Sequence, residues 1–337
     1  MHYLADSEYA LLCSTDPVMW DVVTGFAGKS GIEIKLIVKT VDNIDGLIEY
    51  VRLSEEYGLN PKLTMPLFLG EHPGQQPKKS WVSRDRLAIN TADIIYPVSI
   101  HPGGKLEKLL TETEIAKKIR NDFRIPWKRN SEKNRIPSYD FSGGTVNPFP
   151  DGNWLVHWTR SSQGKWPGEK SWMFIRDLCE NSDIYVRNAK ETLLNMLSEK
   201  RIRGSSWNIP GGTYAVSLTS LPASEAISLM KWRKRYVRYS FEPYGIAIKQ
   251  DILEGMGARE IRYEKVSPDF SGDRLFIQSP GEEGDWTQEK EWRLRGDIRL
   301  DEIDPKNYFA IVYDESDAVE MKKRISNDTL YIHVLKR

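Results

Sequence analysis

The chain has 337 residues, 39% of them hydrophobic, which is enough for two ordinary domains with buried cores. Its 48 Lys and Arg residues balance 48 Asp and Glu residues, so the overall positive charge of a nucleic-acid-coating protein is excluded, although local basic patches are not. Only Cys13 and Cys179 are present, too few for a disulfide framework or a multi-cysteine zinc site. No apolar run approaches the roughly 18 residues of a membrane span and no secretory signal is visible, so we expect a cytoplasmic protein.

The first half is expected to alternate strands with helices. Two apolar or alternating runs of strand length each precede a segment with helical spacing: residues 9–14 before 16–28, and residues 32–38 before 43–58. A third strand is expected at residues 92–100, ahead of a helix that begins near Lys105. This order predicts parallel strands in a Rossmann-like α/β domain.

Residues 24–30, TGFAGKS, end in the Gly-Lys-Ser of a phosphate-binding loop. That loop also needs a glycine where this chain has Val23, and it must follow a strand, whereas the preceding residues have helical spacing. The sequence therefore favours a helix that ends with a glycine cap at Gly28.

A nucleotide site is expected farther along the first half. Arg84 and Arg86 precede a helix, and the Gly103-Gly104 pair stands where a strand passes into the next helix, with backbone N–H groups available for an anion. The run resembles the Rossmann modules of the DprA and lysine-decarboxylase-like (LOG, SLOG) group. The resemblance implies that Ser14, in the place of their Gly-Ser turn, contributes to nucleotide binding. A plain βα turn with surface arginines is the alternative.

The junction between the halves is marked by composition. Residues 117–135 carry eight basic and two acidic side chains, and the stretch that follows is rich in Pro, Gly and Asn. Such a composition does not build core elements. We therefore predict a first domain at residues 1–130, a linker at 131–150 and an α+β domain at 151–337.

Three strands of the second half are expected to have one apolar and one polar side. The polar sides carry His157 and Thr159, then Ser217 and Thr219, then Glu289, Glu291 and Arg293. Converging polar sides would form a cleft suited to a ribose or a dinucleotide. A solvated face is the alternative for each strand taken alone.

The motifs V-H-W-T-R, Y-A-V-S-L-T-S-L-P, P-Y-G-I-A-I and W-T-Q-E-K-E-W-R occur in that order within residues 153–315. The series resembles AbiGi-type abortive-infection proteins and, more remotely, DarT-like ADP-ribosyltransferases. In ADP-ribosyltransferases the first strand supplies a His or Arg for NAD, the second a Ser or Thr for the nicotinamide ribose, and the last a catalytic Glu. The resemblance implies catalytic residues Glu291 and Glu289 and NAD-binding residues His157, Thr159, Arg160, Ser217, Thr219 and Tyr244.

Within that set, Arg160 competes with the pair His157 and Thr159 for the first role, and Tyr244 would stack against nicotinamide. Cleavage of the nicotinamide–ribose bond passes through an oxocarbenium-like state, which a carboxylate such as that of Glu291 stabilises. Glu289 would orient an acceptor, or pair with Arg293.

A basic patch also lies in the second half, and its mixture of cations and aromatic residues predicts contact with nucleic acid. A solvated amphipathic helix is the alternative. The cations are Lys231, Arg233, Lys234, Arg235 and Arg238.

Together these features predict a nucleotide-sensing domain joined to an enzyme that uses NAD and needs no metal ion. The resemblance implies a bacterial effector of stress or phage defence. The alternatives are a non-catalytic regulator that binds nucleotides or nucleic acid and, more weakly, a nuclease, for which the acidic residues lack metal-ligand spacing.

Overall fold

The computed structural model describes most of the chain. The described residues are 9–15, 18–70, 77–127, 138–142, 144–162, 164–180, 187–206, 209, 212–233, 238–265, 272–279, 286–325 and 329–336. The chain divides into two compact units. Unit 1 comprises Met1–Ile136 and Lys170–Ser182, and unit 2 comprises Pro137–Glu169 and Asp183–Arg337.

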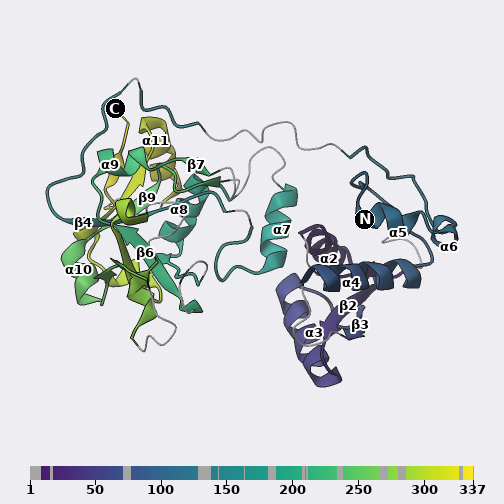
Figure 1. Ribbon diagram of the computed structural model, residues 1–337. Helices are drawn as coiled ribbons and strands as arrows, with labels where there is room; N and C mark the ends of the chain where they lie inside the picture. Colours follow the sequence, from purple (N-terminus) through teal and green to yellow (C-terminus); the bar gives the residue numbers. More distant parts are fainter. Residues whose placement is uncertain are drawn as a thin grey trace. The chain divides into compact units, whose positions relative to one another are not determined.

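Unit 1 contains a parallel sheet of three strands in the order β1-β2-β3 (Figure 1). Its elements are β1 (Leu11–Cys13), α2 (Val18–Ser30), β2 (Ile34–Thr40), α3 (Asn43–Tyr57) and β3 (Thr64–Gly70). Each strand pair is parallel because a helix carries the chain back across the sheet. The predicted α/β character of this half is confirmed.

The third strand is not where the sequence placed it. It is β3, which contains Pro66, and a proline is tolerated there because β3 lies at the edge of the sheet. Residues 92–100 form only an isolated bridge, from Ile95 to Ile119. Pro97 lacks the N–H of a ladder, and Ile95 and Ile100 pack in a separate small core instead.

The helices α4 (Pro77–Thr91), α5 (Lys105–Leu110) and α6 (Thr113–Ala116) follow in unit 1. Two expectations for the helices were wrong. Arg84 and Arg86 lie inside α4 rather than before it. Gly28 lies inside α2 rather than at its end, and a Cβ there would approach Leu59 Cδ2 to 2.8 Å, so close packing accounts for this glycine.

Unit 2 is built on a mixed sheet of seven strands in the order β10-β13-β6-β4-β9-β15-β16. The strands are β4 (Trp154–Trp158), β6 (Ala215–Thr219), β9 (Gly245–Lys249), β10 (Arg259–Glu260), β13 (Glu291–Arg295), β15 (Tyr308–Val312) and β16 (Ile332–Val334). All neighbours are antiparallel except β15 and β16. The chain is therefore mixed α/β, with a small parallel sheet and a larger mixed one.

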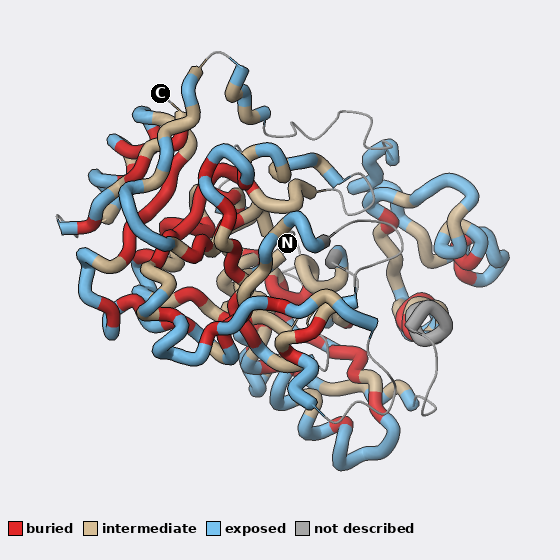
Figure 2. The backbone as a smooth tube through the Cα atoms, turned by 60° about the vertical axis from the view of Figure 1, so that its left-hand side comes forward, coloured by how far each residue is buried: buried red, intermediate tan, exposed pale blue. Residues whose placement is uncertain are grey.

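The two sides of the large sheet have separate cores, to which both its strands and the surrounding elements contribute buried residues (Figure 2). Face A is the side of Leu155 and Ile246, and face B is the side of Val156 and Ala247. Face A packs against α8 (Ala189–Ser198), α10 (Gln250–Gly255) and α11 (Glu315–Arg324), through buried residues such as Leu193, Leu253 and Met321. Face B packs against α9 (Ala223–Ser228).

Short elements surround this sheet. They are the strand pairs β5 (Arg201–Ile202) with β14 (Ile298–Arg299), β7 (Trp232–Arg233) with β8 (Arg238–Tyr239) and β11 (Arg262–Tyr263) with β12 (Ile277–Gln278), and the 3₁₀ turns η2 (Arg274–Phe276), η3 (Trp286–Glu289), η4 (Leu300–Glu302) and η5 (Pro305–Asn307). In the part of the chain that the structure describes, no helix has both the length and the apolar character needed to cross a membrane.

One helix that the sequence assigned to the second domain belongs to unit 1. This helix, α7 (Ser171–Glu180), places Ile175 in the core of unit 1 beside Tyr57. Glu56 of α3 caps its first turn, because Glu56 Oε1 accepts hydrogen bonds from Ser171 N at 2.9 Å and Ser171 Oγ at 2.7 Å. The two units are therefore not contiguous in sequence.

In unit 2, the segments on either side of α7 are joined by a buried ion pair between Glu169 and Arg187, which we call the Glu169–Arg187 clasp. Arg187 is 2% exposed and Glu169 is 8% exposed, and the guanidinium donates through both Nη2 and Nε. The Arg187 guanidinium also lies over the Trp166 ring, 3.9 Å from its centre. The ion pair and the stacking on Trp166 thus hold together the two parts of unit 2 between which the chain passes into unit 1.

Candidate functional site

In unit 1 the structure brings two predicted nucleotide-binding residues close to the end of β1. Ser14 follows β1 directly and is buried, and its carbonyl accepts a hydrogen bond from Thr24 Oγ1 at 2.5 Å. Arg84 is also buried, and its Nη1 donates to the Thr15 carbonyl at 2.9 Å while Nη2 pairs with Asp85 at 2.7 Å. Arg84 therefore holds the loop after β1.

The other predicted members of that site do not form an anion cradle. Arg86 is exposed on α4. The Gly103 N–H donates to Glu107 Oε2 at 2.6 Å, and the Gly104 N–H donates to the His101 carbonyl at 3.0 Å. Since a carboxylate already occupies the position expected for an anion, the expectation that this turn offers free N–H groups was wrong.

In unit 2 the register of β6 and β13 brings predicted residues of both strands together on face B. Thr219 pairs with Glu291 and Ser217 with Arg293, and Val156 of β4 pairs with Thr219. Ser217 Oγ donates to Glu291 Oε1 at 2.9 Å. Thr219 Oγ1 donates to the Glu289 carbonyl at 2.5 Å, which ties η3 to the end of β6.

Glu291 is held by an arginine whose role the sequence left open. Arg293 Nε donates to Glu291 Oε1 at 2.7 Å, and Arg293 Nη2 donates to Glu291 Oε2 at 2.9 Å. Arg293 is 3% exposed and Glu291 is 15% exposed. Arg293 thus pairs with Glu291 rather than with Glu289, and its place two residues along the same strand was the available signal.

His157 and Thr159 lie on the opposite side of the sheet. His157 pairs with Ile246, so alternation places its ring on face A, and its Nδ1 contacts the Ser217 carbonyl of β6 at 2.8 Å. Burial lowers the pKa of His157. Thr159 is buried, and its Oγ1 donates to the Ala189 and Tyr244 carbonyls. The expectation that His157 shares one cleft with Ser217 and Glu291 was wrong.

Arg160, rather than His157, is the residue of this segment that faces the same side of the sheet as Ser217 and Glu291. Backbone pairing continues beyond β4 through Thr159 N–H to the Tyr244 carbonyl, so alternation sends Arg160 to face B. Burial, together with Arg238, lowers the pKa of Arg160 to about 10, while Glu289 and Glu242 act in the opposite direction. Glu242 is buried and accepts hydrogen bonds from Ser161 N at 2.5 Å and Tyr139 Oη at 2.6 Å. Nothing in the sequence singled out Glu242.

Glu289 differs from Glu291 in its charge environment. Burial and the adjacent Glu291 raise the pKa of Glu289 to about 7, against the opposing effect of Arg233, Arg160 and Arg293. Lys290, between the two glutamates, has a φ of 42°, a left-handed backbone that reverses the chain between η3 and β13. A carboxyl group that titrates near neutral pH is suited to proton transfer.

We expect Glu289→Gln to change how stability depends on pH. The pKa of Glu289 is raised from 4.5 to about 7, so the folded state binds this proton more tightly than the unfolded state. The contribution is fully present below pH 4.5 and is lost as the pH rises through about 7. The melting temperature of Glu289→Gln relative to the wild type should therefore increase between pH 5 and pH 8.

Thermal melts at several pH values measure that difference. Glu225→Gln is the control, because it removes an exposed carboxylate that pairs with Lys290. A difference that stays constant from pH 5 to pH 8 in Glu289→Gln would contradict the assigned environment.

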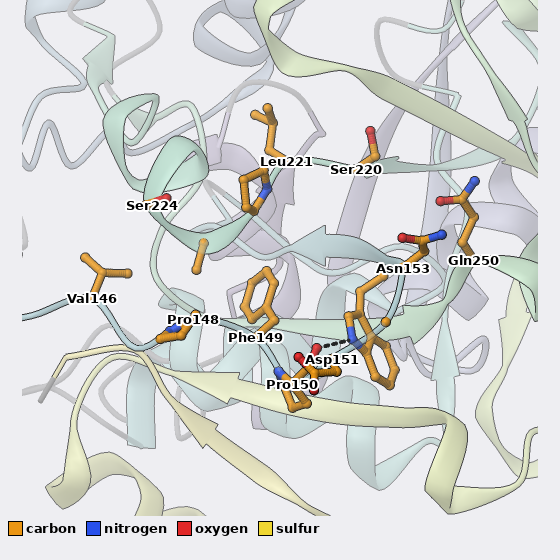
Figure 3. A pocket seen from close by; sticks show the side chains of 14 residues that line it. Val146, Pro148, Phe149, Pro150, Asp151, Asn153, Ser220, Leu221, Ser224 and Gln250 are labelled. Atoms are coloured by element: carbon orange, nitrogen blue, oxygen red, sulfur yellow. Dashed lines mark hydrogen bonds between the residues drawn. The ribbon is translucent and has the colours of Figure 1, made fainter.

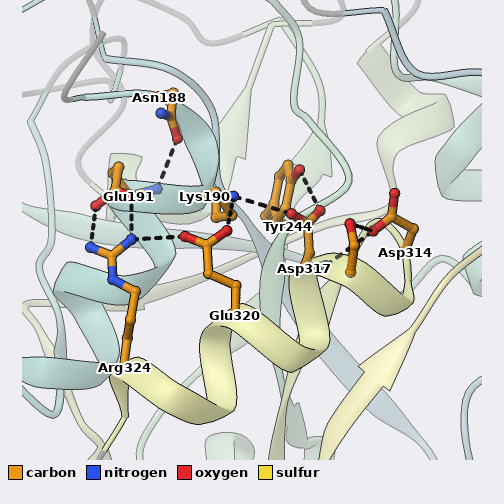
Figure 4. A network of polar contacts seen from close by, with 9 residues as sticks. Asn188, Lys190, Glu191, Tyr244, Asp314, Asp317, Glu320 and Arg324 are labelled. Carbon is orange, nitrogen blue, oxygen red and sulfur yellow. Dashed lines mark hydrogen bonds and ion pairs between the residues drawn. The ribbon is translucent and has the colours of Figure 1, made fainter. Parts of the chain in front are cut away.

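Tyr244 is not available to stack against a ligand. Its ring is buried in the face A core, and its hydroxyl donates to Asp317 Oδ2 at 2.8 Å. Burial raises its pKa. Figure 4 shows that Asp317 belongs to a chain of charged contacts between α8 and α11. The network contains Lys190, Glu191, Asp317, Glu320 and Arg324. Tyr244 therefore has a structural position, and the expectation of a nicotinamide-stacking role was wrong.

The basic patch is a strand pair where the structure describes it. Arg233 belongs to β7 and Arg238 to β8, which excludes the helical alternative for these residues. Lys231 and Arg233 are exposed, and Lys234 and Arg235 lie outside the described residues. Since Arg233 acts on the pKa of Glu289, this strand pair borders the carboxylates of face B.

A cavity of about 560 Å³ lies at the amino-terminal end of β4 (Figure 3). Phe149 and Trp154 supply aromatic walls, and Asn153, Ser220 and Gln250 supply polar groups. The Ser220 N–H donates to the Lys290 carbonyl at 3.3 Å, so the cavity lining is bonded to the turn between the two glutamates. Its volume is in the range of small-molecule sites.

Neither a protein-family model, nor a curated protein, nor a solved structure matches the chain.

Proposed function

We propose that unit 2 is an NAD-dependent ADP-ribosyltransferase or NAD glycohydrolase. The observation that carries the proposal is the array on face B, in which Ser217 and Arg293 hold the Glu291 carboxylate. Arg160 and Glu289 belong to the same charged group. This combination of Arg160, which follows β4, with Ser217 on β6 and Glu291 on β13 supports the reaction class that the sequence motifs suggested.

Each side chain has a chemical role in such a reaction. NAD supplies the ribosyl–nicotinamide bond that breaks. Glu291 would stabilise the positive charge that develops on the ribose as nicotinamide leaves. Arg160 would bind the anionic part of the dinucleotide, the role that the sequence left open between it and His157. Glu289, with a pKa of about 7, would accept the proton of the attacking water or acceptor hydroxyl.

We further propose that unit 1 acts as a nucleotide-sensing module and that the chain is a bacterial defence effector. The support is the position of Ser14 at the end of β1, with Arg84 reaching the same loop from α4, because open α/β sheets bind ligands at this edge. The strand pair β7–β8 supports contact with a nucleic-acid acceptor through Lys231 and Arg233. The sensing role and the defence setting come from the sequence resemblance, whereas the nucleic-acid contact comes from the composition of the basic patch.

The test of the function is nicotinamide release. Purified protein is incubated with NAD alone, with DNA, with RNA and with protein acceptors, and nicotinamide is quantified by chromatography. Turnover supports the proposal. NAD binding without release in every condition would favour the rival, a non-catalytic nucleotide-binding regulator.

A pair of variants separates the two candidates for the first-strand role. Because Arg160 lies with Glu291 on face B and His157 lies on face A, Arg160→Gln should weaken NAD binding by about 10-fold or more, as expected for the loss of a charge-assisted contact. His157→Gln should leave the dissociation constant within about threefold. Isothermal titration calorimetry measures both, and the reverse order would contradict the assignment of faces.

A further inference from the structure

The two glutamates on face B have unlike surroundings, and one side chain accounts for most of the difference. Glu291 receives two hydrogen bonds from Arg293 and one from Ser217. For Glu289, the charges of Arg233, Arg160 and Arg293 oppose the rise in pKa that burial and Glu291 cause. The two carboxylates lie on the same face of the sheet, but only the Glu291 carboxylate is bonded to Arg293 among the described residues.

Arg293 also connects Glu291 to a separate piece of chain. Its Nη1 donates to the Leu275 carbonyl at 2.9 Å, and its Nη2 donates to Gln278 Oε1 at 2.9 Å. Leu275 belongs to η2 and Gln278 to β12, so the guanidinium is held from a second side. These hydrogen bonds are charge-assisted and the side chain is almost fully buried, so the Arg293 guanidinium has little freedom to move.

We propose that Arg293 is the positioning residue of the reaction: it holds both oxygens of Glu291 in one orientation and so selects Glu291, rather than Glu289, as the carboxylate that meets the ribose. The assignment rests on the proposed function. Both Glu291 oxygens are engaged by Arg293 Nε and Nη2, a two-point contact that defines the plane of the carboxylate as well as its position. Ser217 Oγ bonds to Oε1, so the bond to Oε2 from Arg293 is what prevents rotation.

The principal variant is Arg293→Met, which keeps a long apolar side chain and removes every donor. A displacement of the carboxylate by about 1 Å is expected to lower kcat about 100-fold. NAD affinity should stay nearly unchanged, because Arg160 and not Arg293 is assigned to binding. Arg295→Met is the matched control: it lies two residues along the same strand, and its exposed side chain pairs with Asp273.

A double-mutant cycle separates positioning from a general structural effect. In a Glu291→Gln background, Arg293→Met should cause no further loss of kcat beyond about twofold, because the group it positions is already gone. Its effect on the melting temperature should be smaller in that background, because the partner that Arg293 leaves behind is then an uncharged amide. Should Arg293→Met fail to fold, Arg293→Lys carries the test, since it keeps the buried cation and cannot hold both carboxylate oxygens.

The outcomes are distinct. A wild-type chain that releases no nicotinamide overturns the proposed function and this assignment together. An active wild type in which Arg293→Met lowers only the melting temperature, or in which the losses of kcat from Arg293 and Glu291 variants are additive, overturns the assignment alone. Loss of kcat at constant NAD affinity, absent from Arg295→Met and absent in the Glu291→Gln background, supports it.

Discussion

Glu291→Gln should lower the rate of nicotinamide release from NAD by about two to three orders of magnitude, the usual effect of removing a preorganised charge from a transition state. The amide keeps the size of the side chain and one oxygen acceptor for Ser217 or Arg293. It loses the negative charge that would oppose the charge developing on the ribose. The effect should appear in kcat, with NAD affinity little changed.

The control must account for stability. Arg293 is buried against Glu291, so the amide leaves a buried cation with a weaker partner and the melting temperature should fall. Rates are therefore compared at a temperature where circular dichroism shows both proteins folded. Nicotinamide release at the wild-type rate by folded Glu291→Gln would refute the mechanism.

Arg187→Met should produce the largest loss of stability among single changes in unit 2. It removes the cation of the Glu169–Arg187 clasp and leaves the carboxylate of Glu169 buried without its charge partner. Breaking a buried ion pair from one side typically costs about 3–5 kcal/mol. The loss of the stacked contact with Trp166 adds to this. Urea denaturation followed by tryptophan fluorescence measures the free energy of unfolding.

Two comparisons test the cause. Arg299→Met breaks an exposed pair with Asp301 and should cost at most about 1 kcal/mol. The double variant Arg187→Met, Glu169→Gln should recover much of the lost stability. The buried charge is then gone, and the amide oxygen can still accept the hydrogen bond from the backbone N–H of Trp166. Equal losses in the Arg187 and Arg299 variants would mean that the clasp contributes no more than a surface pair.

Strand alternation predicted much of the face B array but misplaced His157. Ser217, Glu291 and Arg293 share a face because each strand alternates with period two, which can be read from the sequence. Which face of β4 meets theirs depends on the pairing of Val156 with Thr219, and no local pattern encodes that register. The polarity of its side chain suggested that His157 lies beside Ser217 and Glu291, whereas the strand register places Arg160 on their face of the sheet.

In unit 1 the first two strands and helices followed from hydrophobic spacing, while the third strand did not. Pro66 within β3 made that run unlike a strand, and only its place at the sheet edge makes it acceptable. Residues 92–100 had the better local pattern, but Ile95 and Ile100 are partly buried against another core. The sequence also did not predict that α7 belongs to unit 1, because α7 contacts residues more than 100 positions earlier in the chain.

Because α7 belongs to unit 1 but lies within the sequence of unit 2, it determines which fragments of the chain contain a complete unit. A fragment that begins after residue 137 carries α7 without α2, α3 and the rest of the core that buries Ile175, so it would display an apolar helix face to solvent. A fragment that ends before residue 137 lacks the same helix and would expose the matching surface. One protease cut between residues 128 and 137 should therefore leave two pieces that stay associated. Neither unit is a single continuous segment of the sequence, so a chimera that exchanges unit 1 must exchange residues 170–182 together with residues 1–136.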